Sequence, residues 1–195
     1  MTYTPFVTYI CMIIAVINFI RMQSLSGQEG SQSAAVDCGA VFRPYIENNH
    51  QYWRLITGGF VHFSIWHLLM NLSVMWSLGR SMEITFVIND GVAGYLIYAA
   101  LLFGSILLGN IFAAYMGNDY TISGGLSSGL YGLMASEIAL VISVHGFLAV
   151  LSDSSLMYTI FINLIMNFIP SISWQAHLGG ACFGVLFTVF VLRLL

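Results

Sequence analysis

The chain has 195 residues, of which 58% are hydrophobic and only 7% are charged, and its mean hydropathy is +0.87. Soluble domains carry about 25% charged residues, so this composition excludes an ordinary soluble fold and indicates an integral membrane protein. The formal net charge is −3, and the basic residues are scattered arginines that form no basic patch. We therefore expect no nucleic-acid partner.

A helix that crosses the hydrocarbon core needs about 20 mainly apolar residues. By this criterion we predict an all-α integral membrane protein with six transmembrane helices. The predicted spans are Pro5–Met22, Phe63–Met82, Val92–Met116, Gly125–Val144, Ser155–Ile169 and Trp174–Leu195. The first lacks the basic start and cleavage site of a signal peptide, so we interpret it as a retained helix. The fifth is short, which suits a helix that tilts or dips into the membrane.

One long connection, residues 23–59, separates the first two predicted spans. It begins rich in Gly, Ser and Gln and then becomes aromatic around Arg43 and Arg54. Aromatic rings and arginines prefer the membrane interface, so we predict a long interfacial first loop. The other connections, including residues 145–154, are predicted to be short and polar.

The second predicted span contains two polar residues on one face. His67 and Asn71 are four residues apart, which places them on the same side of a helix. Polar groups inside membrane helices are costly and commonly functional. A purely structural alternative is that they hydrogen-bond to neighbouring helices as packing contacts. The sequence around them is not His-Glu-x-x-His, so a zinc metalloprotease lacks its ligands and base.

The fourth predicted span opens with Ser123-Gly-Gly-Leu-Ser127-Ser128-Gly. Glycines that lead into a helix place a serine at its N-terminus, where unsatisfied backbone N–H groups can stabilise an oxyanion. The structural alternative is a serine N-cap followed by a glycine-containing membrane helix. In the last span, His177, Gly180 and Gly184 share one face, because they are spaced i, i+3 and i+7. Small residues on such a face allow another helix to approach closely and to meet His177.

The acidic residues and cysteines exclude other chemistries. Glu83 follows Arg80 by three residues, which predicts an ion pair. Glu137 lies ten residues beyond Ser127, about 15 Å along a helix, too far to orient His177. No two aspartates lie within predicted spans, as an aspartyl intramembrane protease requires. The three cysteines have no metal-binding spacing, so we expect no metal, no cofactor and no disulfide.

Taken in order, these motifs resemble the rhomboid family of intramembrane serine proteases over nearly the whole chain. The matching segments are Trp53-Arg54, His67-Leu-Leu-Met-Asn71, Gly125-Leu-Ser127-Ser128 and Ala176-His177-Leu-Gly-Gly180-Ala-Cys-Phe-Gly184. The family pattern has an aromatic residue four positions after the nucleophile, and only Ser127 satisfies it, through Tyr131. Two positions depart from the pattern: Ser128 replaces the usual Gly, and Gln51 replaces an acid that often precedes Trp-Arg.

The resemblance implies a single rhomboid membrane domain over residues 1–195, with a Ser127–His177 dyad and no catalytic acid. It implies an oxyanion site formed by His67, Asn71 and the Ser127 backbone, with Tyr131 stacked on the imidazole. The remaining supporting residues are Gly125, Gly129, Gly180, Gly184 and His62. Gly129, Gly180 and Gly184 would join the fourth and sixth helices. Ser128 would narrow the approach to the oxyanion site.

The function implied by the resemblance is endopeptidase cleavage of transmembrane segments of other proteins, within the lipid bilayer. The expected location is a prokaryotic plasma membrane, with the active site toward the outer face. One alternative is a catalytically inactive rhomboid-like protein that binds membrane proteins. Another is a small channel or transporter, although the sequence shows no inverted repeat or pair of broken helices. The oligomeric state stays open.

Overall fold

A computed structural model describes residues 3–166 and 173–194. The side chains of residues 28, 29, 166 and 191–194 are not described within that range. The elements, in chain order, are α1 (Phe6–Glu29), α2 (Ser31–Asp37), β1 (Val41–Phe42), α3 (Arg43–Asn48), α4 (Arg54–Thr57), a 3-10 turn η1 (Gly58–Phe60), α5 (Ile65–Val74), a π-helical turn η2 (Met75–Gly79), α6 (Arg80–Asp90), α7 (Val92–Met116), β2 (Ile122–Ser123), α8 (Ser127–His145), α9 (Phe147–Ser152), α10 (Ser154–Met166) and α11 (Trp174–Leu194).

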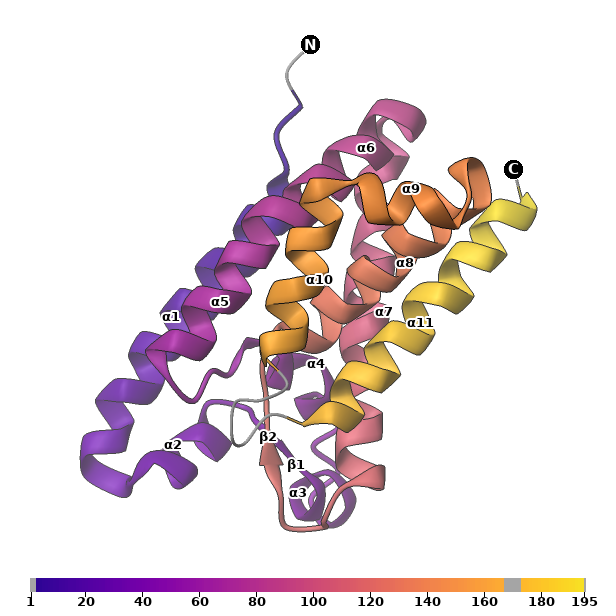
Figure 1. Cartoon of the computed structure of the whole chain (residues 1–195). Coiled ribbons are helices and arrows are strands. Elements are labelled where there is room, and N and C mark those ends of the chain that lie inside the picture. The colour runs from indigo at the N-terminus through magenta and orange to yellow at the C-terminus, as the bar shows by residue number, and fades with distance from the viewer. Residues whose placement is uncertain (1–2, 167–172, 195) are drawn as a thin grey trace.

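The long helices form a bundle, and the short elements α2, α3, α4, β1 and β2 gather at one end of it (Figure 1). Within residues 3–166 and 173–194, three helical segments are long and apolar enough to cross a membrane: Phe6–Gly27, Val92–Met116 and Ser127–His145. The segments Arg54–Phe60 and Ile65–Asp90 meet at an angle of 95°, and they give a fourth candidate span if the bent pair is counted as one. Apolar segments 154–165 and 174–190 are shorter. The chain is therefore a helical, multi-pass membrane protein.

Several predicted boundaries need correction. The first helix does not end at Met22 but continues to Glu29, and the predicted first loop contains short helices and a β-strand. The predicted polar connection 145–154 contains helix α9, with Phe147, Leu148 and Leu151 exposed, as expected of a short helix lying at a membrane surface. The predicted span Val92–Met116 coincides with α7. Residues 167–169 of the fifth predicted span and Leu195 of the sixth lie outside the described residues.

The core packs around α7 and α8. Tyr98, Leu101 and Leu102 of α7 and Leu130 and Leu133 of α8 are fully buried. Such continuous apolar contact, with few cavities, fixes how the helices are rotated relative to one another. The rotation matters for function because it decides which polar side chains meet between the helices.

Glu83 does not form the predicted ion pair with Arg80. Its carboxylate accepts hydrogen bonds from the backbone N–H groups of Val7 and Thr8, both at 2.8 Å. Through these two bonds, the fully buried Glu83 of α6 caps the N-terminus of α1. A negative group at a helix N-terminus satisfies unpaired N–H groups and favourably meets the helix dipole. Arg80 instead lies over the Trp76 ring.

Buried Arg54 holds the chain between α2 and β1 in place. Its Nη1 donates to the carbonyl oxygens of Val36 (2.6 Å) and Ala40 (3.0 Å). Its Nε donates to Oε1 of Gln51 at 2.7 Å, so the neutral amide at this position still anchors the guanidinium. The guanidinium also lies over the Trp53 ring, at 4.6 Å from the ring centre.

Candidate active site

Ser127 begins α8 at the end of the bundle where the short elements lie. Strands β1 and β2 pair antiparallel, with Val41 opposite Ser123, and this pairing holds the segment just before the serine. The N–H of Gly125 donates to the carbonyl of Gly58 at 2.9 Å. Gly125 has φ +133°, a conformation that side-chain-bearing residues rarely adopt. Ser127 follows two residues later and is 5% exposed.

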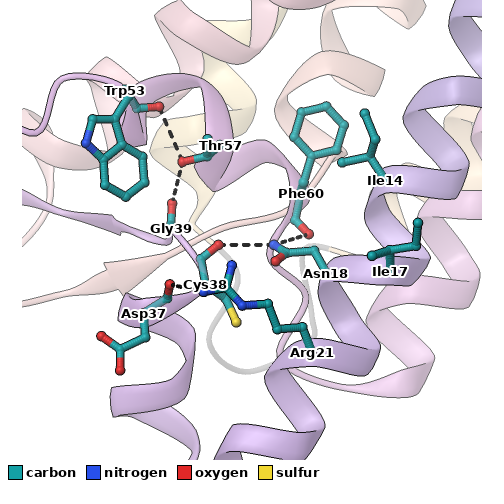
Figure 2. A pocket seen from close by; sticks show the side chains of 10 residues that line it. All are labelled: Ile14, Ile17, Asn18, Arg21, Asp37, Cys38, Gly39, Trp53, Thr57 and Phe60. Carbon is teal, nitrogen blue, oxygen red and sulfur yellow. Dashed lines mark hydrogen bonds between the residues drawn. The ribbon is translucent and has the colours of Figure 1, made fainter.

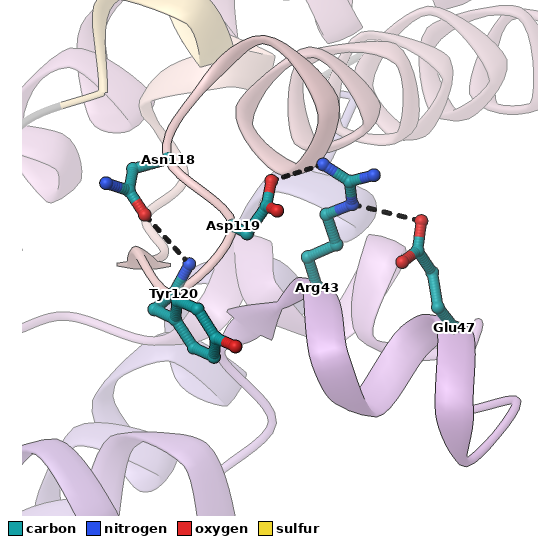
Figure 3. Close-up of polar contacts among 5 residues, drawn as sticks. All are labelled: Arg43, Glu47, Asn118, Asp119 and Tyr120. Carbon is teal, nitrogen blue, oxygen red and sulfur yellow. Dashed lines mark hydrogen bonds and ion pairs between the residues drawn. The ribbon is translucent and has the colours of Figure 1, made fainter.

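Arg43 fastens the loop that leads into β2. Its guanidinium forms ion pairs with Asp119 and, through Nε at 3.0 Å, with Glu47 (Figure 3). The side chain of Asn118 accepts a hydrogen bond from the Tyr120 N–H at 3.2 Å and stabilises the turn. The hydrogen bond to Glu47 raises the pKa of Arg43, which therefore stays charged. These exposed contacts position the loop and contribute little stability.

The structure brings His177 to Ser127. The imidazole Nε2 lies 2.9 Å from the Ser127 Oγ, within hydrogen-bonding distance, and His177 is 4% exposed. Tyr131, one turn after Ser127, stacks on the imidazole with ring centres 4.0 Å apart and planes 10° from parallel. The Tyr131 hydroxyl donates to the carbonyl oxygen of Asn163 in α10. A hydroxyl group, an imidazole and an aromatic ring therefore meet at one place.

The approach of α11 to α8 depends on glycine. A Cβ on Gly180 would overlap the carbonyl of Ser128, and one on Gly184 would overlap the carbonyl of Gly132. Gly129 behaves differently from the prediction, because it faces Leu102 and Ile106 of α7. Gly132 is the α8 glycine that lies against Gly180 and Gly184. Sequence spacing identified the seam on α11 but chose the wrong glycine on α8.

His67 lies at the site, whereas Asn71 lies one turn away. A Cβ on Gly125 would lie 2.8 Å from the His67 Nε2 and 3.5 Å from the Ser127 Oγ. The His67 nitrogen and the Ser127 oxygen therefore lie on either side of the same small space next to Gly125. Among the described residues, the His67 Nε2 has no hydrogen-bond partner. Asn71 is fully buried, and its Nδ2 donates to the His67 carbonyl at 2.8 Å. His62 supports the loop, because its Nε2 accepts from the Leu126 N–H at 3.5 Å.

A cavity of about 10 Å³ adjoins the serine, close to the space that one water molecule needs. Its lining residues are His67, Asn110, Ser123, Gly124, Gly125, Ser127, Ser173 and Ala176. Sequence reasoning missed Asn110, which is 2% exposed in α7 and donates from Nδ2 to the Leu55 carbonyl at 2.9 Å. A lone amide inside an otherwise apolar span was the signal that could have identified it.

Ser128 points away from this cavity. A Cβ on Gly109 of α7 would lie 2.5 Å from the Ser128 Cβ, so the serine side chain fits because the facing residue is glycine. Its Oγ is buried and has no hydrogen-bond partner among the described residues. We predicted that Ser128 narrows the approach to the oxyanion site, but its side chain lies against Gly109 instead.

In the described part of the chain, no cluster of three or more His, Cys, Asp or Glu side chains has the arrangement of a metal site. Cys11, Cys38 and Cys182 are free thiols. The polar groups at the site are thus serine, histidine and amide side chains together with backbone N–H groups.

These features define a multi-pass helical membrane protein with a buried serine–histidine pair between two helices. A family model described as the Rhomboid domain matches residues 49–194, and the chain belongs to the rhomboid family.

Two plant proteins are among its relatives. Inactive RHOMBOID-like protein 8 of Arabidopsis thaliana is 30% identical over 153 residues, covering 77% of this chain and 41% of the relative. RHOMBOID-like protein 1 of the same plant is 30% identical over 162 residues, covering 80% and 39%. The chain thus spans about two fifths of the length of these relatives. Because both are plant proteins, they do not support the predicted prokaryotic membrane.

Proposed function

We propose that this chain is an intramembrane serine endopeptidase that uses Ser127 as nucleophile and His177 as general base. The observation that carries the proposal is the 2.9 Å separation between the Ser127 Oγ and the His177 Nε2 in a buried setting. A nucleophile within hydrogen-bonding distance of a base, with the base oriented by a third group, is the arrangement that covalent catalysis needs. Here the third group is the Tyr131 ring.

In the first step, the Ser127 Oγ attacks the carbonyl carbon of a peptide bond while its proton passes to the His177 Nε2. The tetrahedral intermediate then collapses, the C–N bond breaks, and the imidazolium gives this proton to the leaving amine. Water, deprotonated by the same imidazole, hydrolyses the acyl-serine and frees Ser127. No carboxylate is required, because the stacked Tyr131 restricts the rotation of the imidazole.

The oxyanion would be stabilised by the Ser127 backbone N–H and by His67. Ser127 opens α8, so its N–H has no partner within the helix. The unpartnered His67 Nε2 borders the same point as the serine oxygen and can donate when it carries the proton. Asn71 joins this group if its amide turns away from the His67 carbonyl. Loss of one such donor typically costs about 2.7–4 kcal/mol of transition-state stabilisation.

The membrane arrangement is the second part of the proposal. We assign six transmembrane spans within one rhomboid domain over residues 1–195, with the first-loop elements at the interface and the active site toward the outer face. The substrate is a transmembrane segment of another protein, unwound locally to expose a carbonyl. The 10 Å³ cavity is too small for it, so the site must open. We assign the gate to α10, which packs against α5 and α8.

A disulfide crosslink between α5 and α10 tests the gate. The parent variant would replace Cys11, Cys38 and Cys182, so that the only pair of thiols is the engineered one. We expect the crosslink to stop cleavage of a membrane-embedded substrate and its reduction to restore it. Unchanged cleavage in the crosslinked protein would exclude α10 as the gate.

A non-catalytic binding role is the alternative, because one relative is named as inactive. This chain keeps both Ser127 and His177 in contact, which favours catalysis. One assay distinguishes catalysis from binding: purified protein in mild detergent is incubated with a single-span reporter substrate, and cleavage is measured. The parallel samples are Ser127→Ala, His177→Ala and the matched control Ser128→Ala.

We expect the first two variants to lose cleavage and the control to retain it. Loss in Ser128→Ala alone would move the nucleophile by one residue. If the unmodified protein neither cleaves nor reacts with a serine-directed covalent probe, the binding role replaces catalysis.

A further inference from the structure

A groove of about 450 Å³ lies between α1 and the first-loop elements, away from the serine site. Figure 2 shows its lining residues, which come from α1, from the end of α2 and the residues after it, and from Trp53 and the α4–η1 segment that follows it. Small-molecule sites typically have volumes of about 300–1,000 Å³, so the groove is large enough for part of a lipid. It opens on the face of α1 that carries many exposed apolar side chains.

One wall of the groove is apolar and continuous with the membrane-facing surface. Ile14 and Ile17 of α1 are 42% and 60% exposed, and the buried Phe60 also lines the groove. Asn18 fastens this wall, because its Nδ2 donates to the carbonyl oxygens of Cys38 (3.1 Å) and Phe60 (3.2 Å). The wall therefore has the shape and polarity to hold an acyl chain along α1.

Arg21 provides a cation at the polar end of the groove. It follows Ile14 by seven residues and Ile17 by four, so all three share one face of α1. It lies six residues before the end of the apolar segment at Gly27, which is about 9 Å along the helix. A long basic side chain at this depth reaches the lipid headgroups.

The guanidinium of Arg21 is poorly satisfied by the protein. Its Nη2 donates a long hydrogen bond of 3.4 Å to the Asp37 carbonyl oxygen. Among the side chains that the structure describes, no Asp or Glu forms an ion pair with Arg21. A guanidinium presents several N–H donors in a planar fork that matches a phosphate. Arg21 is exposed, so its remaining donors are accessible to an oxyanion from outside the chain.

The other titratable groups of the groove determine which headgroup fits. Asp37 brings one negative charge, and in Figure 2 its carboxylate points away from the Arg21 guanidinium. Burial raises the pKa of the Cys38 thiol, which is therefore uncharged at neutral pH. One cation and one anion at separate positions complement a headgroup that carries both a phosphate and an ammonium.

We propose that this groove binds one zwitterionic membrane phospholipid, with its phosphate on Arg21, its ammonium toward Asp37 and an acyl chain along Ile14 and Ile17. The site is separate from Ser127 and does not depend on the proposed protease activity. Its occupant would hold the first-loop elements against α1 at the membrane interface.

Native mass spectrometry of the intact chain tests the proposal. The protein would be released from nanodiscs that contain equal amounts of phosphatidylethanolamine and phosphatidylglycerol, and the retained lipids would be counted and identified. The variants are Arg21→Gln and Asp37→Asn. Arg80→Gln is the matched control, because Arg80 is an exposed arginine that contacts Trp76 outside the groove.

We expect the unmodified protein and Arg80→Gln to retain one phosphatidylethanolamine. Arg21→Gln should lower this occupancy by about tenfold, the usual effect of losing a charge-assisted hydrogen bond. Asp37→Asn should keep a bound lipid but lose the preference for phosphatidylethanolamine. Equal loss in Arg21→Gln and Arg80→Gln, or no retained lipid in the unmodified protein, would overturn the site. A preference of the unmodified protein for phosphatidylglycerol would overturn the headgroup assignment.

Discussion

Adding one methyl group at Gly180 tests whether the close approach of α11 to α8 sets the catalytic distance. In Gly180→Ala, the new Cβ would overlap the Ser128 carbonyl oxygen and lie 2.8 Å from its carbonyl carbon. Ordinary carbon contacts begin near 3.4 Å, so the difference between 3.4 and 2.8 Å requires the backbones to separate by at least 0.6 Å.

This displacement acts close to the reacting atoms. Ser128 directly follows the proposed nucleophile, Ser127, and Gly180 lies three residues after His177, one helical turn away. Transmitted in full, the shift lengthens the 2.9 Å contact between Ser127 Oγ and His177 Nε2 to about 3.5 Å, the outer limit of a hydrogen bond. Misplacement of about 1 Å can cost about 100-fold in rate, and we expect a loss of that order. Overpacking should also cost about 1–3 kcal/mol of stability.

Gly184→Ala separates the catalytic effect from the stability effect. Its Cβ would lie 2.8 Å from the Gly132 carbonyl carbon, so the clash is similar, but Gly184 is seven residues from His177. We expect comparable destabilisation and a much smaller loss of cleavage. Gly27→Ala is the unstrained control, because its added Cβ would meet no atom within 4 Å apart from its own chain neighbours and the nearby backbone of its helix. Reporter cleavage, labelling by a serine-directed probe and unfolding in detergent would be measured together. A folded Gly180→Ala protein with wild-type cleavage would refute the reasoning.

Three further substitutions test the surroundings of the site. In Gly125→Ala, a Cβ 2.8 Å from the His67 Nε2 displaces this donor, and the φ of +133° adds strain, so cleavage should fall by at least about 100-fold in a kinetic assay. Glu83→Gln should lower the free energy of unfolding by about 2 kcal/mol, whereas the exposed control Glu47→Gln should change it by less than about 0.5 kcal/mol in the same denaturant titration. Ser128→Ala removes a buried hydroxyl that has no partner among the described residues, so it should raise the free energy of unfolding by about 1 kcal/mol without slowing cleavage. A large loss of stability would contradict its assigned position.

Spacing along the chain predicted the relations that a single helix enforces. Tyr131 lies four residues after Ser127, and Gly180 and Gly184 share the face of His177, because the α-helical repeat dictates it. Helix α7 was predicted to the residue, since Gly91 and Gly117 flank it. Relations between helices were predicted only where the family resemblance supplied them, as for Ser127 and His177.

Contacts that depend on packing between distant segments were not predictable. Glu83 meets Val7 and Thr8 across 75 or more residues, whereas local spacing favoured Arg80. Gly129 and Gly132 look equivalent in sequence, and only the rotation of α8 in the bundle decides that Gly132 faces α11. The cavity contacts of Asn110 could not be predicted for the same reason, because its neighbours come from other elements, although a lone amide in an apolar span marked the residue itself.

Tyr131 connects the proposed catalytic helix to the proposed gate, and this connection predicts that removing its hydroxyl group speeds cleavage. Its ring stacks on His177, while its hydroxyl donates to the Asn163 carbonyl of α10. Tyr131→Phe keeps the ring but removes one hydrogen bond that holds α10 closed against α8. A neutral hydrogen bond contributes about 1 kcal/mol, which corresponds to about a fivefold change in the opening equilibrium.

If opening of α10 limits the reaction, Tyr131→Phe should therefore cleave a membrane-embedded substrate about fivefold faster. Labelling of Ser127 by a small serine-directed probe should not change, because the probe needs no gate and the stacked ring is retained. Tyr131→Leu is the contrasting variant: it loses the stacked ring as well, so both readouts should fall. Equal slowing of both readouts in Tyr131→Phe would show that the hydroxyl supports the dyad rather than the gate. The gate would then have to be sought in another element.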